Sequence, residues 1–69
     1  MKVSARNQIP GTVVAVTDGA VNGTVKVDIG GGTIVTASIT EEAIADLALQ
    51  KGDAVTVVIK ASDVMIGKG

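Results

Sequence analysis

The chain has 69 residues, so it holds one small domain and has no room for a second. Apolar residues make up 46% of it, but none is Phe, Tyr or Trp, the side chains that bury the most area each. Cys and His are both absent, so neither a disulfide nor an ordinary zinc site can stabilise the fold. A domain of this size buries only about 60% of its unfolded surface, and we therefore expect self-association to supply the missing burial.

Six basic and seven acidic residues give a net charge of −1 and an isoelectric point near 5.0. This balance provides no broad positive field for a nucleic-acid backbone, and the aromatic stacking platforms of single-strand binders are absent. No stretch reaches the roughly 20 apolar residues that span a bilayer, and the first residues lack the apolar core of a signal peptide. We expect a cytoplasmic protein that binds neither nucleic acid nor membrane.

The density of β-branched residues predicts a protein built mostly of strands. Val, Ile and Thr account for 26 of the 69 residues, which favours a pleated, half-buried surface. The first predicted strand covers residues 12–16. A hairpin follows over 24–39, because apolar and polar residues alternate from 24 to 29 and the glycines at 30–32 permit the positive φ angles of a turn.

A short helix is predicted after this hairpin. Thr40 can cap it, and Glu41 and Glu42 stand in the first turn, where the helix dipole favours negative charge. We interpret these two carboxylates as a helix start and not as a metal site, since adjacent helical positions do not face each other. Lys51 and Gly52 are interpreted as the cationic last turn and the terminating glycine.

The last predicted strand covers residues 54–60, and Val58 weakens its alternation, so we expect its second face to meet another subunit. A short apolar run at 64–66 precedes a flexible tail at 67–69. Five short strands, glycine-rich turns and one short helix indicate a mainly β domain over 1–69. The expected architecture is a small Greek-key barrel like the oligonucleotide/oligosaccharide-binding (OB) fold, with a plain two-layer sheet as the alternative.

Two motifs have ordinary explanations that we prefer. The run at 28–33, with three successive glycines, looks like the phosphate hairpin of sugar kinases and actin-like ATPases, but those enzymes need two large domains. We interpret it as a hairpin turn. Lys60 and Ser62 share a strand face, the minimum for a Ser-Lys catalytic pair, yet nothing nearby predicts the desolvated cleft that such a pair needs. We expect no enzyme activity.

Near each end of the chain a cation stands close to a hydroxyl. Ser4-Ala5-Arg6 lies near the start, and Lys60-Ala61-Ser62 lies near the end. An oxyanion needs such a set, because charge offsets its desolvation and directional donors fix its oxygens. The alternative is that the two cations are surface charges paired loosely with Asp53 or Asp63.

Five strings of the sequence are shared with a known family. In chain order they are Ser4-Ala5-Arg6-Asn7-Gln8, Gly11-Thr12-Val13, Gly19-Ala20-Val21-Asn22, Ile39-Thr40 and Ile59-Lys60-Ala61-Ser62-Asp63-Val64-Met65. They resemble the molbindins, small molybdate-binding proteins first described as molybdenum-pterin-binding, whose unit is the TOBE-type domain. The resemblance covers residues 2–66. It implies a cytoplasmic homo-oligomer, commonly a hexamer, of barrel-like domains that holds molybdate or tungstate between subunits and needs no organic cofactor.

The resemblance also implies which residues contact the anion. They are Ser4, Ala5, Arg6, Thr40, Lys60 and Ser62. Relatives often carry a hydroxyl three residues after the threonine, where this chain has Ala43, and Pro10 replaces a residue with an N–H. Because the first and last motifs occupy opposite ends of a chain too small to enclose an anion, we expect Ser4 and Arg6 from one subunit and Lys60 from a neighbour.

Two functions remain open after the sequence is considered. The first is a non-enzymatic protein that stores or buffers molybdate or tungstate for cofactor synthesis. The second is a structural or regulatory assembly module whose oxyanion binding is weak or vestigial, as the alanine at position 43 allows. A site made of donors suits a dianion without a proton and selects against phosphate, so only cavity size separates sulfate from molybdate.

Overall fold

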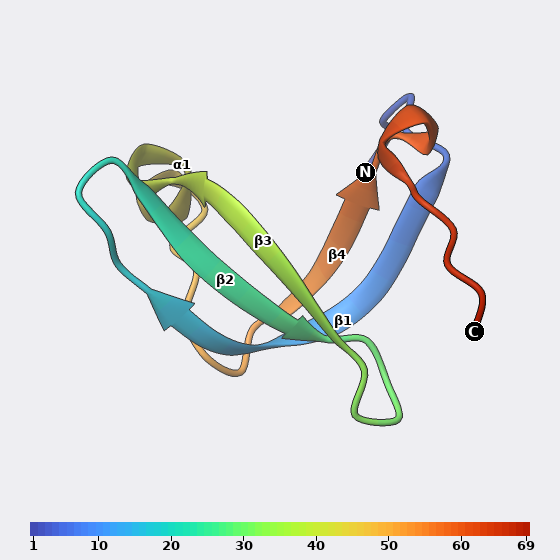
Figure 1. The fold of residues 1–69 in the computed structure, drawn as a ribbon. Coiled ribbons are helices and arrows are strands. Elements are labelled where there is room, and N and C mark those ends of the chain that lie inside the picture. Colours follow the sequence, from blue (N-terminus) through green and yellow to red (C-terminus); the bar gives the residue numbers. More distant parts are fainter.

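The computed structural model describes residues 1–69 as a four-stranded antiparallel sheet with one short α-helix (Figure 1). The elements are β1 (Asn7–Thr17), β2 (Asn22–Asp28), β3 (Ile34–Thr40), α1 (Glu41–Asp46), β4 (Ala54–Ile59) and the 3-10 helix η1 (Ala61–Asp63). The order in the sheet is β3-β2-β1-β4. Three successive hairpin-connected strands and a fourth that returns beside the first form a Greek key, which confirms the predicted fold class.

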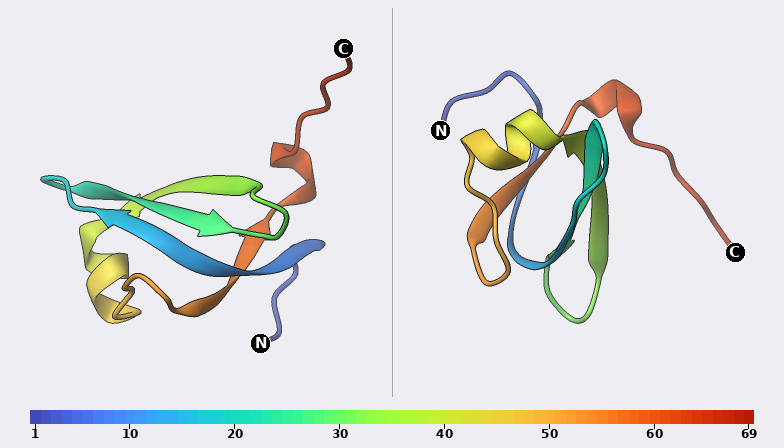
Figure 2. Two further views of the ribbon diagram at one scale, coloured as in Figure 1. Left: turned by 90° about the horizontal axis from the view of Figure 1, so that it is seen from below. Right: turned by 90° about the vertical axis from the view of Figure 1, so that its left-hand side faces the viewer.

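Strand β1 is long enough to pair with two partners in succession. Residues 7–12 pair with β4, and residues 12–17 pair with β2. The register shifts between Val13 and Ala15, so Val14 forms a bulge at which the strand bends. The sheet therefore bends at β1 so that its two halves face each other across the apolar interior (Figures 1 and 2), and β3 and β4 remain unpaired edges of an open sheet.

The first half of β1 was not predicted, because Pro10 and Gly11 interrupt the strand pattern. Proline lacks a donor N–H and is normally confined to sheet edges. It is accommodated here because β2 pairs with β1 only from Thr12 onward, so β4 is the only strand paired with Pro10. Gly11 is required by close packing, since a Cβ at this position would lie 2.6 Å from Val27 Cγ1.

The β2–β3 hairpin confirms the prediction for residues 24–39. The three glycines of its turn all have positive φ angles, between 61° and 115°. Two hydrogen bonds lie within the turn. The N–H of Gly30 donates to Asp28 Oδ1 at 2.8 Å, and the N–H of Thr33 donates to the carbonyl of Gly30 at 3.1 Å. These internal bonds support the interpretation of the glycine run as a turn.

Helix α1 begins at its predicted start but ends earlier than predicted. Thr40 is its N-cap, and the helix ends at Asp46 with no basic residue in its last turn, so Lys51 and Gly52 play no part in its end. Ala48 adopts a φ of +50°, and the N–H of Leu49 donates back to the helix at 3.1 Å. Leu49 then packs against the core, which favours this early end.

No helix in this structure is long and apolar enough to cross a membrane.

The core is small and lies between the curled sheet and α1. Its buried apolar residues are Val13, Val25, Val27 and Ile44. Gly23 is buried as well, and a Cβ there would lie 2.5 Å from Ile44 Cδ1, so only glycine lets α1 approach β2 this closely.

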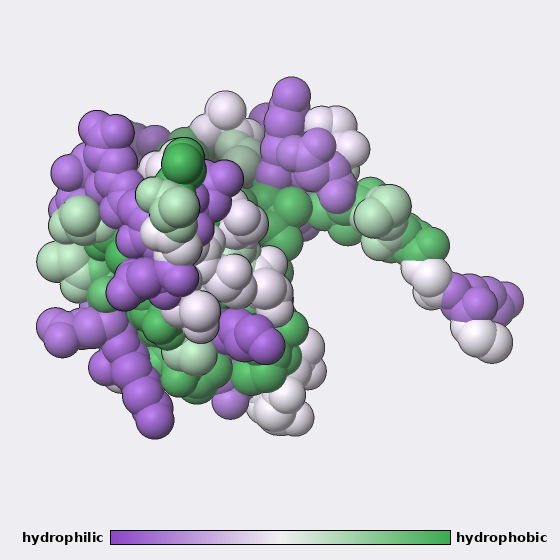
Figure 3. All heavy atoms as spheres, turned by 60° about the vertical axis from the view of Figure 1, so that its left-hand side comes forward, coloured by the Kyte–Doolittle hydropathy of each residue, from purple (hydrophilic) through white to green (hydrophobic).

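Four strands form, one fewer than the five expected. The apolar residues at 64–66 follow η1 without pairing, because η1 turns the chain out of the sheet at the end of β4. Met65 is 92% exposed and Ile66 is 90% exposed. Figure 3 shows this segment as an apolar stretch that extends from the body of the protein before the polar C-terminus.

Candidate functional site

The pairing of β1 with β4 brings the two ends of the sequence together. Asn7 is paired with Ile59, so the residues before Asn7 and those after Ile59 leave the sheet side by side. Together they form one pocket of about 460 Å³, which is lined by Ser4, Ala5, Arg6, Lys60, Ala61 and Ser62. The structure therefore gathers five of the six predicted contact residues from opposite ends of the chain.

Neither half of the pocket belongs to a strand. Residues 4–6 precede β1, and residues 60–62 enter η1, which is closed by a bond of 2.9 Å from Asp63 N to the carbonyl of Lys60. Residues 4–6, 61 and 62 lie outside the strands and α1. Their backbone N–H groups donate no hydrogen bond to another group of the chain. The pocket thus combines two cations and two hydroxyls with unpaired backbone donors.

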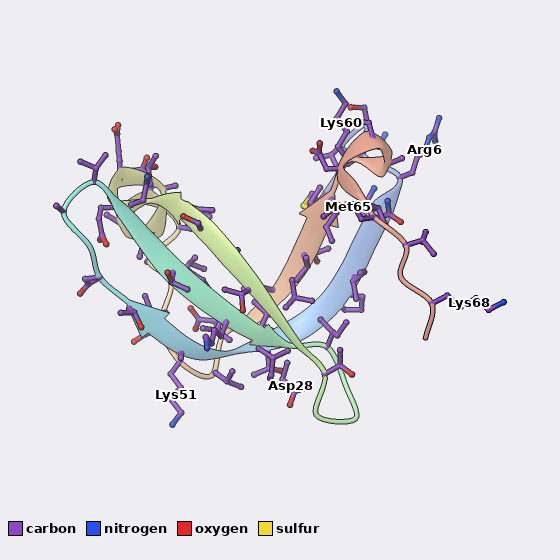
Figure 4. The ribbon with its side chains drawn as sticks, viewed as in Figure 1. Arg6, Asp28, Lys51, Lys60, Met65 and Lys68 are labelled. Atoms are coloured by element: carbon purple, nitrogen blue, oxygen red, sulfur yellow. The ribbon has the colours of Figure 1, made fainter.

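The charged side chains of the pocket are exposed. Arg6 and Lys60 extend from the same end of the sheet (Figure 4). Asp53, one of the alternative partners, lies at the other end of β4 and accepts from the N–H of Gln50 at 2.9 Å. Asp63, the other, lies in η1 without lining the pocket. No group of three His, Cys, Asp or Glu side chains gathers where a metal cation could bind.

The Ser-Lys alternative finds no support in this geometry. Lys60 and Ser62 are both exposed, so this chain forms no desolvated cleft around them. Ala61, which lies between them, is the lining residue that the sequence reasoning did not single out. Ala61 lies within the last of the five strings that this sequence shares with the molbindins, and that position could have indicated it as a lining residue.

Thr40 does not line this pocket. It ends β3 and caps α1, at the opposite end of the molecule from η1 (Figures 1 and 2). Its Oγ1 accepts from the N–H of Ala43 at 3.1 Å, and its side chain is exposed. Glu41 holds this helix start against the β1–β2 turn, because its Oε1 accepts from the N–H of Gly19 at 2.6 Å.

The predicted division of the site between chains needs a correction. We expected Lys60 to come from a neighbour because the two motifs lie at opposite ends of the sequence. Antiparallel pairing places Lys60 beside Ser4 and Arg6 of its own chain. The predicted residue that is separated from the pocket is Thr40.

Comparison with known proteins reveals relatives of the same size and fold. Residues 3–66 match the TOBE domain. The chain is 48% identical over 66 residues to molybdenum-pterin-binding protein 3 of Clostridium pasteurianum, covering 96% of this chain and 97% of that protein.

Two solved structures share the fold. A molybdate-binding protein from Sporomusa ovata matches with a TM-score of 0.91 and 38% identity, covering 99% of this chain and 100% of that one. The cytoplasmic molybdate-binding protein ModG, solved with molybdate bound, matches with a TM-score of 0.88 and 45% identity, covering 94% of this chain and 46% of ModG. All three relatives are described as binding proteins. The match over nearly the whole chain, in sequence and in fold, shows that this protein belongs to the molybdenum-pterin-binding proteins, or molbindins, of the TOBE domain family.

Proposed function

We propose that this protein binds molybdate or tungstate as an oxyanion, catalyses no reaction, and stores or buffers the anion in the cytoplasm. The observation that carries the proposal is the pocket in which Arg6 and Lys60, from opposite ends of the sequence, stand beside two serine hydroxyls. Relatives at 38% and 45% identity are described as molybdate-binding, and one of them, ModG, as cytoplasmic. Such a role needs no organic cofactor.

The donors of the pocket suit a dianion that carries no proton. Arginine, lysine and backbone N–H groups donate hydrogen bonds and cannot accept them, and only the hydroxyls of Ser4 and Ser62 can do both. Molybdate, tungstate and sulfate are fully deprotonated near neutral pH, whereas phosphate usually carries a proton that needs an acceptor. We therefore expect the pocket to disfavour phosphate.

A second copy of the chain completes the proposed site. Pockets of several hundred Å³ hold drug-sized ligands, so a single tetrahedral anion leaves this pocket of about 460 Å³ open to water. Thr40 is exposed at the other end of the molecule, and its oxygen already accepts a hydrogen bond from Ala43. Its hydroxyl proton is therefore free to donate. We place Thr40 of one copy over the pocket of another, with the anion between subunits.

Exposed apolar surface supports this self-association. Only 5 of the 69 residues are buried in the single chain, which is little for a domain without disulfides or metals. Large apolar side chains are exposed on the β1–β2 turn, the end of α1, β4 and the C-terminal segment, namely Val21, Leu47, Val58, Met65 and Ile66. We propose a homo-oligomer that covers these side chains, with six chains as the family resemblance implies.

An assembly module with weak or vestigial oxyanion binding is the alternative function. Ala43 favours it, because the methyl group at this position cannot donate the hydrogen bond that relatives often provide. This alternative predicts the same oligomer without saturable binding of molybdate.

Mixed oligomers test whether two copies share the site. Arg6→Ala and Thr40→Asp chains are made separately, unfolded, refolded together in equal amounts, and assayed for bound molybdate. Aspartate preserves the helix cap but places a negative charge against the anion. If Thr40 of one copy faces Arg6 of another, roughly a quarter of the sites receive both wild-type residues, because each is present with a chance of about one half.

Each variant refolded alone is the control, and we expect little binding by either. Normal binding by Thr40→Asp refolded alone contradicts the shared site, because it shows that Thr40 of a neighbour does not face the anion. That result leaves oxyanion binding within one chain intact, since Thr40 does not line the pocket of its own chain. Recovery of no binding in oligomers shown by native mass spectrometry to be mixed also contradicts the shared site.

A further inference from the structure

Two side-chain amides next to the pocket hold its two halves in place. Asn7 and Gln8, the first two residues of β1, follow Arg6 directly but do not line the pocket. They donate two of the six hydrogen bonds that involve side chains in this structure. Both acceptors are backbone carbonyls at the margin of the pocket.

The amide of Asn7 bridges the two strands where they separate. Its Nδ2 donates to the carbonyl of Ile59 at 3.1 Å, in a part-buried position. Asn7 and Ile59 are the last pair of the β1–β4 ladder, and Lys60 follows directly. This cross-strand bond therefore fixes how far the half of the pocket that carries Arg6 lies from the half that carries Lys60.

The amide of Gln8 holds the N-terminal half. Its Nε2 donates to the carbonyl of Ala5 at 3.0 Å. Residues 4–6 take part in no other hydrogen bond of the chain. The bond from Gln8 is therefore the only hydrogen bond that connects their backbone to β1. It determines where the hydroxyl of Ser4 and the guanidinium of Arg6 stand relative to the strand.

We propose that Asn7 and Gln8 are positioning residues that set the size selectivity of the pocket, an inference that rests on the proposed oxyanion function. Molybdate and sulfate carry the same charge and offer the same kind of acceptor, so a set of donors can distinguish them only by its spacing. The two amides fix that spacing without contacting the anion. When they are lost, the donors can close around the smaller sulfate, so molybdate loses more affinity than sulfate does.

The variants remove the amides and keep the shape of the side chains. Asn7→Leu and Gln8→Met are similar in size to the originals but cannot donate. The matched control is Gln50→Met, because the side chain of Gln50 is exposed, forms no hydrogen bond and lies at the other end of β4. Gln8 is exposed, so its replacement does not threaten the fold even if that of the part-buried Asn7 does.

Calorimetric titrations with molybdate and with sulfate measure selectivity. We expect Asn7→Leu and Gln8→Met to weaken molybdate binding about three- to tenfold, the size of one net hydrogen bond, and to lower the ratio of molybdate to sulfate affinity. Gln50→Met should match the wild type in both titrations. Equal losses for the two anions, or no loss, would overturn the inference.

Backbone ¹⁵N relaxation of the anion-free proteins separates this inference from the proposed function. We expect order parameters for residues 4–6 to fall in Gln8→Met, and those for residues 4–6 and 60–62 to fall in Asn7→Leu, while those of the strands stay near the rigid value of about 0.85. If these segments loosen but the wild-type protein binds no tetrahedral anion, the proposed function fails and the selectivity fails with it, while the ordering of the two segments by the amides stands. If the segments keep their order in both variants, the positioning role fails whatever the protein binds.

Discussion

Replacing Arg6 or Lys60 by Ala is expected to weaken molybdate binding by about 2–5 kcal/mol. The loss is this large because, between subunits, each cation and the dianion are removed from water together, and truncation leaves the anion without that partner. Charges that stay on the surface contribute well under about 1 kcal/mol. Isothermal titration calorimetry of each variant measures the difference.

The matched control for these variants is Lys68→Ala. Lys68 lies beyond the residues that match the TOBE domain, and its side chain extends from the C-terminal tail, away from the pocket (Figure 4). We expect this variant to bind molybdate as tightly as the wild type. Small and equal losses in all three variants would show that Arg6 and Lys60 are ordinary surface charges.

Replacing Ile44 by Ala is expected to lower the free energy of unfolding by about 2–5 kcal/mol, the usual range for truncating a buried isoleucine. Ile44 is 7% exposed and is the one core residue that α1 contributes. A small domain has only a few kcal/mol of stability to lose, so the variant should be largely unfolded at modest urea concentrations. Urea denaturation at a fixed protein concentration measures the effect.

Leu47→Ala is the control on the same segment. Leu47 follows the last residue of α1 and is 66% exposed in the single chain, so its truncation should affect assembly more than the stability of the folded chain. Analytical ultracentrifugation measures the assembly. A midpoint for Ile44→Ala within experimental error of the wild type would contradict the assignment of Ile44 to the core.

Local patterns predicted the elements whose conformation depends on their own residues. The β2–β3 hairpin alternates with a period of two, and its turn contains the glycines that positive φ angles require. The first half of β1 depends instead on where β2 begins, which allows Pro10 to lie inside a strand. The end of α1 likewise depends on the packing of Leu49 against the core, which no local pattern records.

The candidate site was likewise predicted in part by local patterns and in part depends on contacts between distant residues. Residue chemistry indicated an oxyanion, and the family resemblance supplied the residues. Their placement follows from the pairing of Asn7 with Ile59, a contact between distant parts of the chain. The separation of Thr40 from the pocket also follows from the strand order, because β3 and β4 lie at opposite edges of the sheet.

Calorimetric titration of the wild-type protein with molybdate, sulfate and phosphate tests the proposed function most directly. We predict saturable binding of molybdate, weaker binding of sulfate and no binding of phosphate, because the pocket consists mainly of donors and its spacing distinguishes the anions by size. The result that would contradict this function is an intact oligomer that takes up no molybdate, or one that binds phosphate as tightly as molybdate.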